Sequence, residues 1–526
     1  MDSQIRKKLL LISFGNVQNF ISNARKTIDL YNGSMIVQKL VLTTQEILYK
    51  INVNGLSSVK IDSDKNDIVD GKFVIDDEDK VEEKYVPNFL LYRCSYSGNR
   101  DNEQLENCIF EMVKKELNKR VRVKERNFFV PEDIIPYVVM VDYDENDYQN
   151  AYAKIHQKLN GYKNSEKNGN TFCNKKNTKN SNHVCSICGI RYGDKSEIKK
   201  AEYLCEECKA KREWSKDQSN KVIHFESVDS IAKLVKNDGT YYGIIRADMD
   251  DMGKKMGTVD SSYKEMGLRE WQNNLKIFLK EFMKEMTSYL RNLEEGKELL
   301  IYAGGDDILF FCPIDKIIDT LNEIDQFIKE SRESIGKQKI DISDKITMSK
   351  CVTITHKHVP LKRVIQLSKE HLEQTKSFQF KKGDHRKNKV GFLMIFGGYD
   401  FDFTVIKQEN MECFSHIFEG INKEYSRSFF YQLQNQIIKF GTEIPDENGD
   451  HILKIIQNDM RRILSRKIKN NTVDVEKYVD ELYELYLMFT EDGAYKRLIN
   501  SPCFFNMLHI MDKWATELKG GRENNE

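Results

Sequence analysis

The sequence of 526 residues has no net charge, because 82 Lys and Arg residues balance 82 Asp and Glu residues. Without net charge there is no overall field that attracts nucleic acid or acidic lipid, so any polyanion must be met by local basic patches. The sequence also lacks a long apolar run. The longest, residues 134–141, contains Pro136 and falls far short of the roughly 18 residues of a membrane span. No small-residue cleavage site precedes the first strand-like run, so we expect neither a secretory signal nor a membrane partner.

Cysteine is not used here as a disulfide framework would use it. The eleven Cys residues are odd in number and scattered, and four of them form two CxxC pairs. This usage is typical of a reducing compartment and a metal site, and it predicts a cytoplasmic protein. Because 40% of the residues are hydrophobic, the chain can bury several cores, and its length predicts about three to four domains.

Hydrophobic patterns divide the sequence into four predicted segments. Residues 1–160 mix strand-like and helical runs, which predicts an α+β domain. Residues 161–225 contain the cysteine pairs, which follow a stretch rich in Asn, Lys, Ser and Gly (159–184) that predicts a solvated loop. Residues 226–405 follow the order β-α-β-β-α-β-α-β, a ferredoxin-like core with one extra unit. Residues 406–526 show only amphipathic helical patterns, which predicts a C-terminal helical bundle.

Acidic side chains end one predicted strand and form the tip of a predicted hairpin. The strand runs into Asp248-Met249-Asp250-Asp251, and the hairpin tip is Gly304-Gly305-Asp306-Asp307. In a βαββ unit the first strand and the hairpin are neighbours, so Asp248 can converge with Asp306 and Asp307 as a catalytic set. Carboxylates held together repel unless cations neutralise them. Two Mg²⁺ or Mn²⁺ ions, with Asp248 and Asp306 as ligands, would activate a 3′-hydroxyl and bridge the phosphates of a nucleoside triphosphate.

The glycines of the tip suit a nucleotide site. Gly304 and Gly305 have no Cβ atom, so they allow a tight turn and let a triphosphate approach the backbone. Gly and Asp are also common in plain hairpin turns, which is the alternative interpretation. Two hydrophobic strands flank the tip, however, and a second acidic cluster ends a strand where the fold requires one. These observations favour catalysis.

A basic segment joins the last helix of this domain to its last strand. It begins with Lys376 at the helix end and continues through a glycine-containing loop to Lys387. Both side chains suit contact with triphosphate oxygens, and Lys376 is the favoured candidate. Helix capping and a solvated loop would explain the same residues, Lys387 in particular.

The two cysteine pairs, Cys185/Cys188 and Cys205/Cys208, have the spacing CxxC-x16-CxxC. Each pair can hold one side of a tetrahedral Zn²⁺ ion. Four thiolates leave no open coordination position, so the predicted zinc ion is structural. Free thiols or a redox pair are the alternatives.

These residues together resemble the large palm-domain subunit of type III CRISPR effector complexes, in the Cmr (type III-B) form. The most specific likeness lies in residues 14–21 (FGNVQNFI), 24–27 (ARKT) and 29–34 (DLYNGS). The cysteine pairs, the Asp248 strand, the hairpin tip and the helical C-terminus follow in the family's order. The resemblance implies two ferredoxin-like palm domains, a zinc-ribbon insertion between them and a C-terminal helical domain that contacts neighbouring subunits.

The resemblance also implies an activity. When the guide-loaded complex recognises foreign RNA, the second palm would polymerise ATP into 3′–5′ cyclic oligoadenylate, with Asp248, Asp306 and Asp307 as metal-binding and catalytic residues. The partners would be other Cmr-type subunits, the guide CRISPR RNA and the target RNA. The first palm would be catalytically degenerate, since its first strand ends in Phe14-Gly15 without an acidic tip, and it would hold a nucleotide at most.

Several alternatives stay open. Many family members begin with an HD nuclease domain, but no His-Asp dipeptide occurs here and the first palm starts within fifteen residues of Met1, so we expect no nuclease activity. A subset of nuclease-less Cmr-type enzymes joins AMP to S-adenosylmethionine instead, and the sequence does not decide between the products. A cyclic-dinucleotide synthase also carries a Gly-Gly box, but normally with sensory or membrane segments. A catalytically silent architectural subunit is the third alternative, although both Asp306 and Asp307 are present.

One basic stretch is a candidate RNA contact. Lys114, Lys115, Lys119, Arg120, Arg122 and Lys124 cluster near the end of a predicted helix. A solvated helix face would explain the same pattern.

Overall fold

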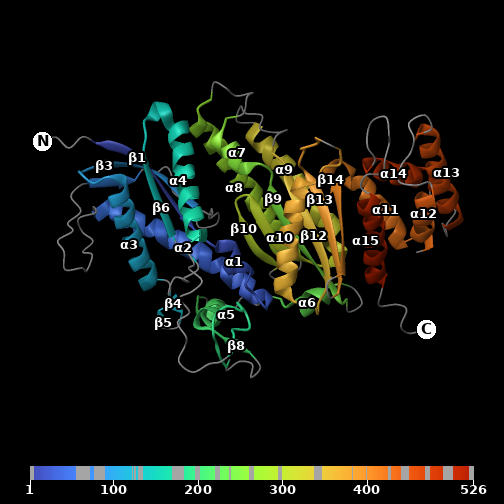
Figure 1. Cartoon of the computed structure of the whole chain (residues 1–526), viewed down its shortest axis with the longest axis horizontal. Helices are drawn as coiled ribbons and strands as arrows, with labels where there is room; N and C mark the ends of the chain where they lie inside the picture. The colour runs from blue at the N-terminus through green and yellow to red at the C-terminus, as the bar shows by residue number, and fades with distance from the viewer. Residues whose placement is uncertain are drawn as a thin grey trace. The chain divides into compact units, whose positions relative to one another are not determined.

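The computed structural model, drawn in Figure 1, divides into two compact units, each made of two separate stretches of the chain. The first comprises Met1–Phe225 and Asp251–Asp306, and the second comprises Glu226–Asp250 and Asp307–Glu526. The residues that the structure describes are 5–54, 72–75, 89–120, 122–123, 126–127, 134, 136–168, 183–195, 202–218, 226–235, 239–259, 266–293, 299–336, 346–381, 383–397, 400–423, 428–439, 449–467, 474–489 and 501–519.

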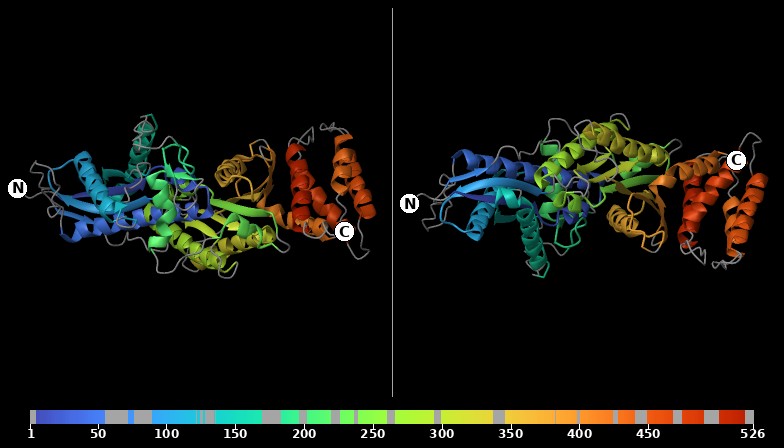
Figure 2. Two further views of the ribbon diagram at one scale, coloured as in Figure 1. Left: turned by 90° about the horizontal axis from the view of Figure 1, so that it is seen from below. Right: turned by 90° about the horizontal axis from the view of Figure 1, so that it is seen from above.

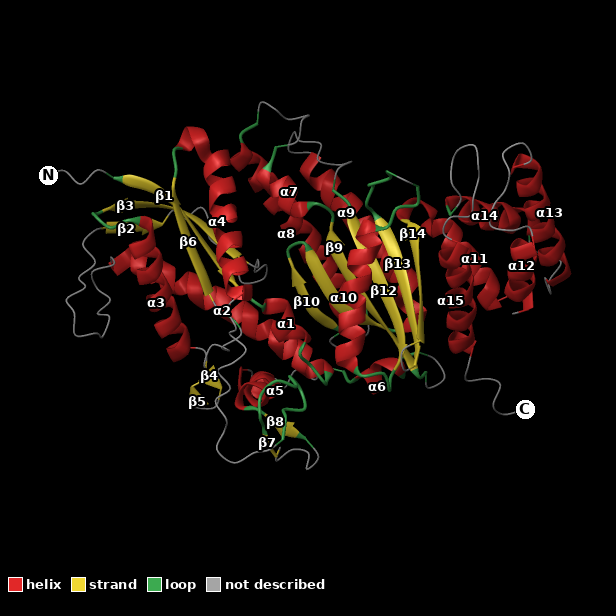
Figure 3. Ribbon diagram, viewed as in Figure 1, coloured by secondary structure: helices red, strands yellow, loops and turns green. Residues whose placement is uncertain are grey.

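A four-stranded antiparallel sheet with strand order β2-β3-β1-β6 forms the centre of the first unit (Figure 3). Its strands are β1 (Arg6–Phe14), β2 (Lys72–Ile75), β3 (Phe89–Ser97) and β6 (Pro136–Asp142). The helices around it are α1 (Val17–Ser22), α2 (Thr27–Asn54), α3 (Asn102–Arg120) and α4 (Tyr148–Asn168). Strands and helices follow the order β-α-β-β-α-β, so this core is ferredoxin-like.

Strand β1 is one of the two inner strands of this sheet and is buried from Lys8 to Phe14. Leu9 and Leu11 pack with Ala151 and Ile155 of α4 in one hydrophobic cluster. Because successive side chains of a strand alternate between faces, Leu10 and Ile12 point to the opposite face. Both are fully buried, which explains the continuous apolar run in the sequence.

The composition of residues 159–184 predicts a solvated loop, but helix α4 continues through the first part of this stretch to Asn168. The prediction is therefore wrong for residues 159–168. Leu159 is buried in the sheet's core cluster, and Lys163 Nζ donates to Ser13 Oγ at 3.1 Å. These contacts keep the segment helical, although its polar composition is typical of a loop. The remaining residues up to 182, including Cys173, lie outside the described residues.

The first unit also contains five short strands and three more helices. They are β4 (Arg122–Val123), β5 (Arg126–Asn127), β7 (Asp194–Lys195), β8 (Tyr203–Leu204), α5 (Glu206–Gln218), α7 (Met252–Gly257), α8 (Leu268–Asn292) and β10 (Leu300–Gly304). Strands β7 and β8 pair beside the cysteine pairs and precede α5.

In the second unit the strands pair in the order β11-β9-β12-β13-β14. These are β9 (Tyr241–Met249), β11 (Asp307–Cys312), β12 (Met348–His356), β13 (Lys389–Gly397) and β14 (Asp400–Lys407). The helices are α6 (Val228–Ala232), α9 (Ile317–Gly336) and α10 (Leu361–Ser377). Strands β12 and β13 are parallel, with α10 as their crossover, and the other pairs are antiparallel. Along the chain, with α8 and β10 between β9 and β11, the elements follow the order predicted for residues 226–405, and the additional strand β14 was not predicted.

The C-terminal part of the second unit is helical, as predicted (Figure 2). Its helices are α11 (Met411–Lys423), α12 (Ser428–Lys439), α13 (Gly449–Lys467), α14 (Val475–Met488) and α15 (Ser501–Lys519). The predicted α+β class, with two ferredoxin-like cores, a four-cysteine insertion and a helical C-terminus, is confirmed. Across the described ranges, the structure contains no helix long and apolar enough to cross a bilayer.

Trp514 joins helix α15 to the sheet of the second unit. Its side chain is fully buried, and its ring centroid lies 4.2 Å from that of Phe418 and 6.2 Å from that of Phe392 on β13. Its indole Nε1 donates to the carbonyl oxygen of Ile314 at 3.1 Å. One side chain thus fills the core and satisfies a buried acceptor.

We predict that Trp514→Ala lowers the free energy of unfolding by about 3–5 kcal/mol, because it leaves a large cavity and an unpaired carbonyl group. Chemical denaturation of the full chain, followed by circular dichroism, measures this. Tyr431→Ala is the control, since Tyr431 is 55% exposed and its loss should change little. Equal midpoints for the two variants would contradict the prediction.

Candidate active site and metal centre

Two of the predicted catalytic carboxylates lie opposite each other on paired strands. Strands β9 and β11 are antiparallel, with Asp248 across from Asp307. Directly opposed residues of antiparallel strands share a face of the sheet and have Cβ atoms about 5 Å apart. Asp248 is the next-to-last residue of β9 and Asp307 is the first residue of β11. The structure therefore brings both carboxylates to one end of the sheet, and the 28% exposed side chain of Asp248 is accessible there.

Lys376 forms an ion pair with this acidic end. Its ammonium Nζ donates to Oδ2 of Asp248, and the Lys376 side chain is 16% exposed. Lys376 lies in the last turn of α10, the crossover helix between β12 and β13. The pair partly neutralises the carboxylate in the absence of another cation.

The predicted tight turn precedes Asp307. Gly305 and Asp306 form the two-residue turn between β10 and β11. Gly305 has φ +74°, a left-handed conformation that favours glycine. A Cβ atom added at Gly304 or Gly305 would meet no atom within 4 Å among the described residues, chain neighbours aside, so the space beside this backbone is open. Asp306 is half-buried in the turn, next to Asp307.

Lys387 lies in the loop between α10 and β13. The next residue, Asn388, has φ +65°, and its backbone N–H donates to Oδ2 of Asp250 at 2.9 Å. The structure therefore ties the loop that carries Lys387 to the acidic string after β9. Sequence reasoning singled out Lys387 and overlooked the role of Asp250, because the string Asp248-Met249-Asp250-Asp251 does not show which carboxylate is buried.

The four predicted zinc ligands meet at one point. The Sγ atoms of Cys185, Cys188, Cys205 and Cys208 all lie within 4.8 Å of one another, and all four residues are buried. Cys188 Sγ and Cys205 Sγ are 4.0 Å apart. A tetrahedral zinc ion with Zn–S bonds of about 2.3 Å requires sulfur atoms roughly 3.8 Å apart, so the cluster can bind zinc with little adjustment.

The sulfur atoms also share hydrogen bonds. Hydrogen bonds from Cys188, Cys205 and Cys208 hold the pKa of the Cys185 thiol far below its ordinary value. The hydrogen bonds with Cys185 and Cys188 raise the pKa of the Cys205 and Cys208 thiols, so a divalent cation bound here would replace thiol protons on this second pair. His183, close by in the sequence, stacks on Tyr203 with ring centroids 3.9 Å apart and is outside this cluster.

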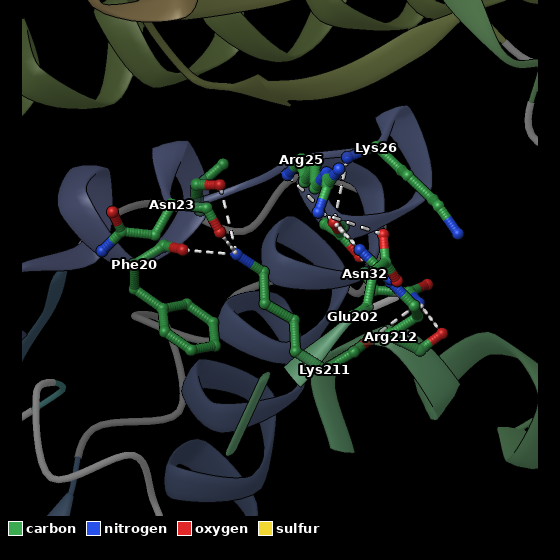
Figure 4. Close-up of polar contacts among 10 residues, drawn as sticks. Phe20, Asn23, Arg25, Lys26, Asn32, Glu202, Lys211 and Arg212 are labelled. Atoms are coloured by element: carbon green, nitrogen blue, oxygen red, sulfur yellow. Dashed lines mark hydrogen bonds and ion pairs between the residues drawn. The ribbon is translucent and has the colours of Figure 1, made fainter. Parts of the chain in front are cut away.

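A buried lysine attaches helix α5, which carries Cys208, to residues 14–34, here called the N-terminal motif (Figure 4). Lys211 Nζ donates to the carbonyl oxygens of Phe20 at 2.5 Å, Ile21 at 3.2 Å and Asn23 at 2.9 Å. These carbonyl groups lie at the C-terminal end of α1, where backbone acceptors lack partners within the helix. Burial lowers the pKa of Lys211 to about 8.

Arg212, the next residue of α5, binds two buried carboxylates. Its Nε and Nη2 donate to the two carboxylate oxygens of Asp29 at 2.8 and 2.7 Å, and its Nη1 donates to Glu202 at 2.5 Å. Asp29 also accepts the backbone N–H groups of Arg25 and Lys26, where α2 begins. Burial by itself would raise the pKa of Asp29, but Arg212 and these N–H groups hold it below its ordinary value.

Residues of the N-terminal motif also donate hydrogen bonds to helix α5. The side-chain amide of Asn32 donates to the carbonyl oxygens of Lys211 and Arg212 at 2.8 and 3.1 Å. A Cβ atom at Gly33 would lie 2.7 Å from Cε of Lys211, so glycine allows the close approach. Residues 29–34, which carry part of the family likeness in the sequence, thus pack against α5, the helix that carries Cys208.

Comparison with known families decides the classification. A family model for the second palm domain of Cas10/Cmr2 matches residues 241–391, the segment that contains Asp248, the glycine turn and Lys376. A model for the N-terminal part of the CRISPR-associated protein Cmr2 matches residues 9–54. Both matched segments are therefore similar to the Cas10/Cmr2 palm family. The family predicted from the sequence is confirmed.

Individual relatives agree with this. The Cmr subunit Cmr2 of Pyrococcus furiosus is 25% identical over 147 residues, a match that covers 25% of this chain and only 16% of the relative. The match to a type III-B Cmr-beta structure in the apo state covers 99% of this chain and 82% of the matched chain, with 14% identity and a TM-score of 0.55. The match to a Cmr-beta structure bound to cognate target RNA covers 99% of this chain and 84% of the matched chain, with 13% identity and a TM-score of 0.60. At these identities the structures show a shared fold.

We predict that Arg212→Ala destabilises the first unit by about 3–5 kcal/mol, because it leaves the fully buried carboxylate of Asp29 without its ion pair. Thermal or chemical unfolding of the full chain measures the change. Arg461→Ala is the matched control: Arg461 also binds a carboxylate through two hydrogen bonds, to Glu476, but on the surface. Surface pairs contribute little, so similar losses in the two variants would contradict the prediction.

We predict that the purified chain contains one zinc ion, and that Cys188→Ser together with Cys208→Ser removes it. Elemental analysis by mass spectrometry gives the stoichiometry. Because Cys208 and Lys211 lie on the same helix, metal loss should also increase hydrogen exchange in residues 17–34. Cys351→Ser, a buried cysteine of β12, is the control that should keep the metal. A wild-type chain purified without zinc, together with equal hydrogen exchange in residues 17–34 of the wild type and the double variant, would refute a structural zinc.

Proposed function

We propose that this Cas10/Cmr2-type chain is the nucleotidyltransferase subunit of a type III-B CRISPR effector complex and converts ATP into cyclic oligoadenylate when the complex binds target RNA. The observation that carries the proposal is the opposition of Asp248 and Asp307 at one sheet end, inside the segment that matches the second palm domain. We propose the division into a first palm (1–160), a linker and zinc module (161–225), a second palm (226–405) and a helical domain (406–526).

The residues at this sheet end fit divalent cations. Carboxylate oxygens of Asp248, Asp306 and Asp307 are the hard ligands that Mg²⁺ and Mn²⁺ prefer. Such ions, when bound, would lower the pKa of an attacking 3′-hydroxyl and neutralise the triphosphate. Their ligands come from the end of β9 and the start of β11, which are both held by the backbone ladder.

Lys376 and the glycine turn would serve the triphosphate. Asp248 accepts the Lys376 ammonium, so a cation on Asp248 competes for the same oxygen and frees Lys376 for a phosphate oxygen. The open space beside Gly304 and Gly305 leaves their backbone within reach of a ligand. Lys387, in the loop before β13, is a further candidate contact for the phosphates.

The first palm would lack catalysis. Strand β1 ends in Phe14, a buried apolar residue, at the position where β9 carries acidic residues.

We propose other Cmr-type subunits, the guide CRISPR RNA and target RNA as partners, which agrees with the Cmr names of the relatives. Of the basic stretch 114–124, Lys114 Nζ lies 5.5 Å from the centroid of the Phe110 ring. The side chains of Lys119, Arg120, Arg122 and Lys124 lie outside the described residues.

The test uses the reconstituted complex with guide RNA, target RNA, Mg²⁺ or Mn²⁺ and labelled ATP, with products identified by mass spectrometry. We expect cyclic oligoadenylate, and we expect Asp248→Asn and Asp307→Asn each to reduce its formation on the order of a hundredfold or more, because each removes a charged ligand. Glu323→Gln, which changes an exposed carboxylate of α9, is the control and should keep full activity.

Other outcomes distinguish the alternatives. A product that forms only with S-adenosylmethionine and disappears in Asp307→Asn would keep the site and change the reaction to transfer of AMP to that acceptor. If ATP is unchanged under every condition while the complex still binds target RNA, the palm is architectural and the proposed function is wrong. Turnover that does not depend on target RNA would contradict the proposed activation.

A further inference from the structure

Asp250 is buried beside the proposed active site and accepts hydrogen bonds from three groups. Its side chain is 1% exposed. Its Oδ2 accepts from Thr347 Oγ1 at 2.7 Å and from the backbone N–H of Asn388 at 2.9 Å, and its Oδ1 accepts from Ser349 Oγ at 2.7 Å. The backbone N–H of Asp250 donates to the carbonyl oxygen of Thr347 at 2.8 Å.

These contacts join three separate segments. Asp250 follows β9 directly, Thr347 and Ser349 lie at the start of β12, and Asn388 ends the loop between α10 and β13. The loop is therefore fastened to the same strand end that carries Asp248.

The loop is held at further points next to Asn388. The carbonyl oxygen of Asn388 accepts the backbone N–H of Gln408 at 3.1 Å. Lys389, the first residue of β13, is buried, and its Nζ donates to the carbonyl oxygen of Phe378, just after the end of α10. Lys387 precedes these two residues, so the path of the backbone at Lys387 is determined on its C-terminal side.

We propose that Asp250 is a positioning residue: it holds the loop that carries Lys387 against the strand end with Asp248, so that the loop is in place when ATP binds. This proposal rests on the proposed function. Asp250 would act through the backbone N–H of Asn388 and not as a metal ligand, because the protein already supplies donors to both of its oxygen atoms.

The conservative variant separates these roles. In Asp250→Asn, the amide oxygen can accept from Thr347 and Asn388 while the amide NH₂ donates to the Ser349 hydroxyl, which can serve as an acceptor. A carboxylate that binds a metal ion would instead lose its negative charge in an Asp→Asn change, and metal binding would weaken. Asp250→Ala removes all three acceptor contacts and leaves the Asn388 N–H without its partner.

The first experiment measures ATP turnover by the complex with target RNA. We expect Asp250→Ala to raise KM for ATP on the order of tenfold, with kcat changed much less, because a charged acceptor of several hydrogen bonds is lost. Asp250→Asn should restore KM to within about threefold of the wild type. A loss of kcat in Asp250→Asn as deep as in Asp248→Asn would overturn the proposal, since Asp250 would then act as a ligand.

A double-mutant cycle tests the connection to Lys387. Lys387→Ala should raise KM in the wild-type background and have little further effect in Asp250→Ala, because the loop is already displaced. Fully additive effects, or no effect of Lys387→Ala alone, would overturn the proposal.

Hydrogen exchange on the full chain gives a readout independent of catalysis. We expect the Asn388 amide and its neighbours in 383–388 to exchange on the order of tenfold faster in Asp250→Ala, and at nearly the wild-type rate in Asp250→Asn. Unchanged protection in Asp250→Ala would overturn the proposal. If the wild-type complex turns over no ATP, the proposed function fails by itself, and the exchange rates together with the binding affinity for Mg²⁺-ATP still decide the role of Asp250.

Discussion

The register of strand β9 with its two neighbours is the constraint on which the second unit depends. β9 pairs with β11 on one side and β12 on the other, and at one level of the sheet Asp248 stands between Asp307 and Ser349. A slip of one residue would turn every side chain of β9 to the opposite face, separating the carboxylates and exposing buried apolar residues. The burial of β9 therefore holds the acidic end in place, and the same hydrophobic contacts that stabilise the sheet position its polar chemistry.

In the first unit the corresponding constraint is electrostatic. Lys211 and Arg212 on α5 place two cationic groups in the junction between α1 and α2, where carbonyl oxygens and the Asp29 carboxylate surround them. Buried charges are costly unless they are paired, so each partner requires the other. Because α5 begins next to Cys205 and includes Cys208, the cysteine cluster and the N-terminal motif share one rigid helix. The two features look unrelated in the sequence and are parts of one packed structure.

Sequence reasoning succeeded where the pattern was strong and local. The strands around Leu9–Ile12 and Ile244–Ala247 are buried on both faces and apolar except for Arg246, and α8 and α10 have clear helical periodicity. It was wrong for residues 159–168, because a few buried contacts outweigh a polar composition. It also overlooked strand β14, whose partner β13 supplies the backbone hydrogen bonds that a single segment does not reveal.

The sequence by itself determined the spacing of the four cysteines, the acidic ends of the strand and hairpin, and the order of elements, since each of these follows from residues close together in the chain. Tertiary structure alone decided the surroundings of each acidic residue. Asp248 and Asp250 are two positions apart, yet one is partly exposed opposite Asp307 and the other is buried among hydroxyl and backbone donors. The physical reason is that the role of a carboxylate depends on its solvation and on its hydrogen-bond donors, and these come from β12 and from Asn388, about 100 and 140 residues further along the chain.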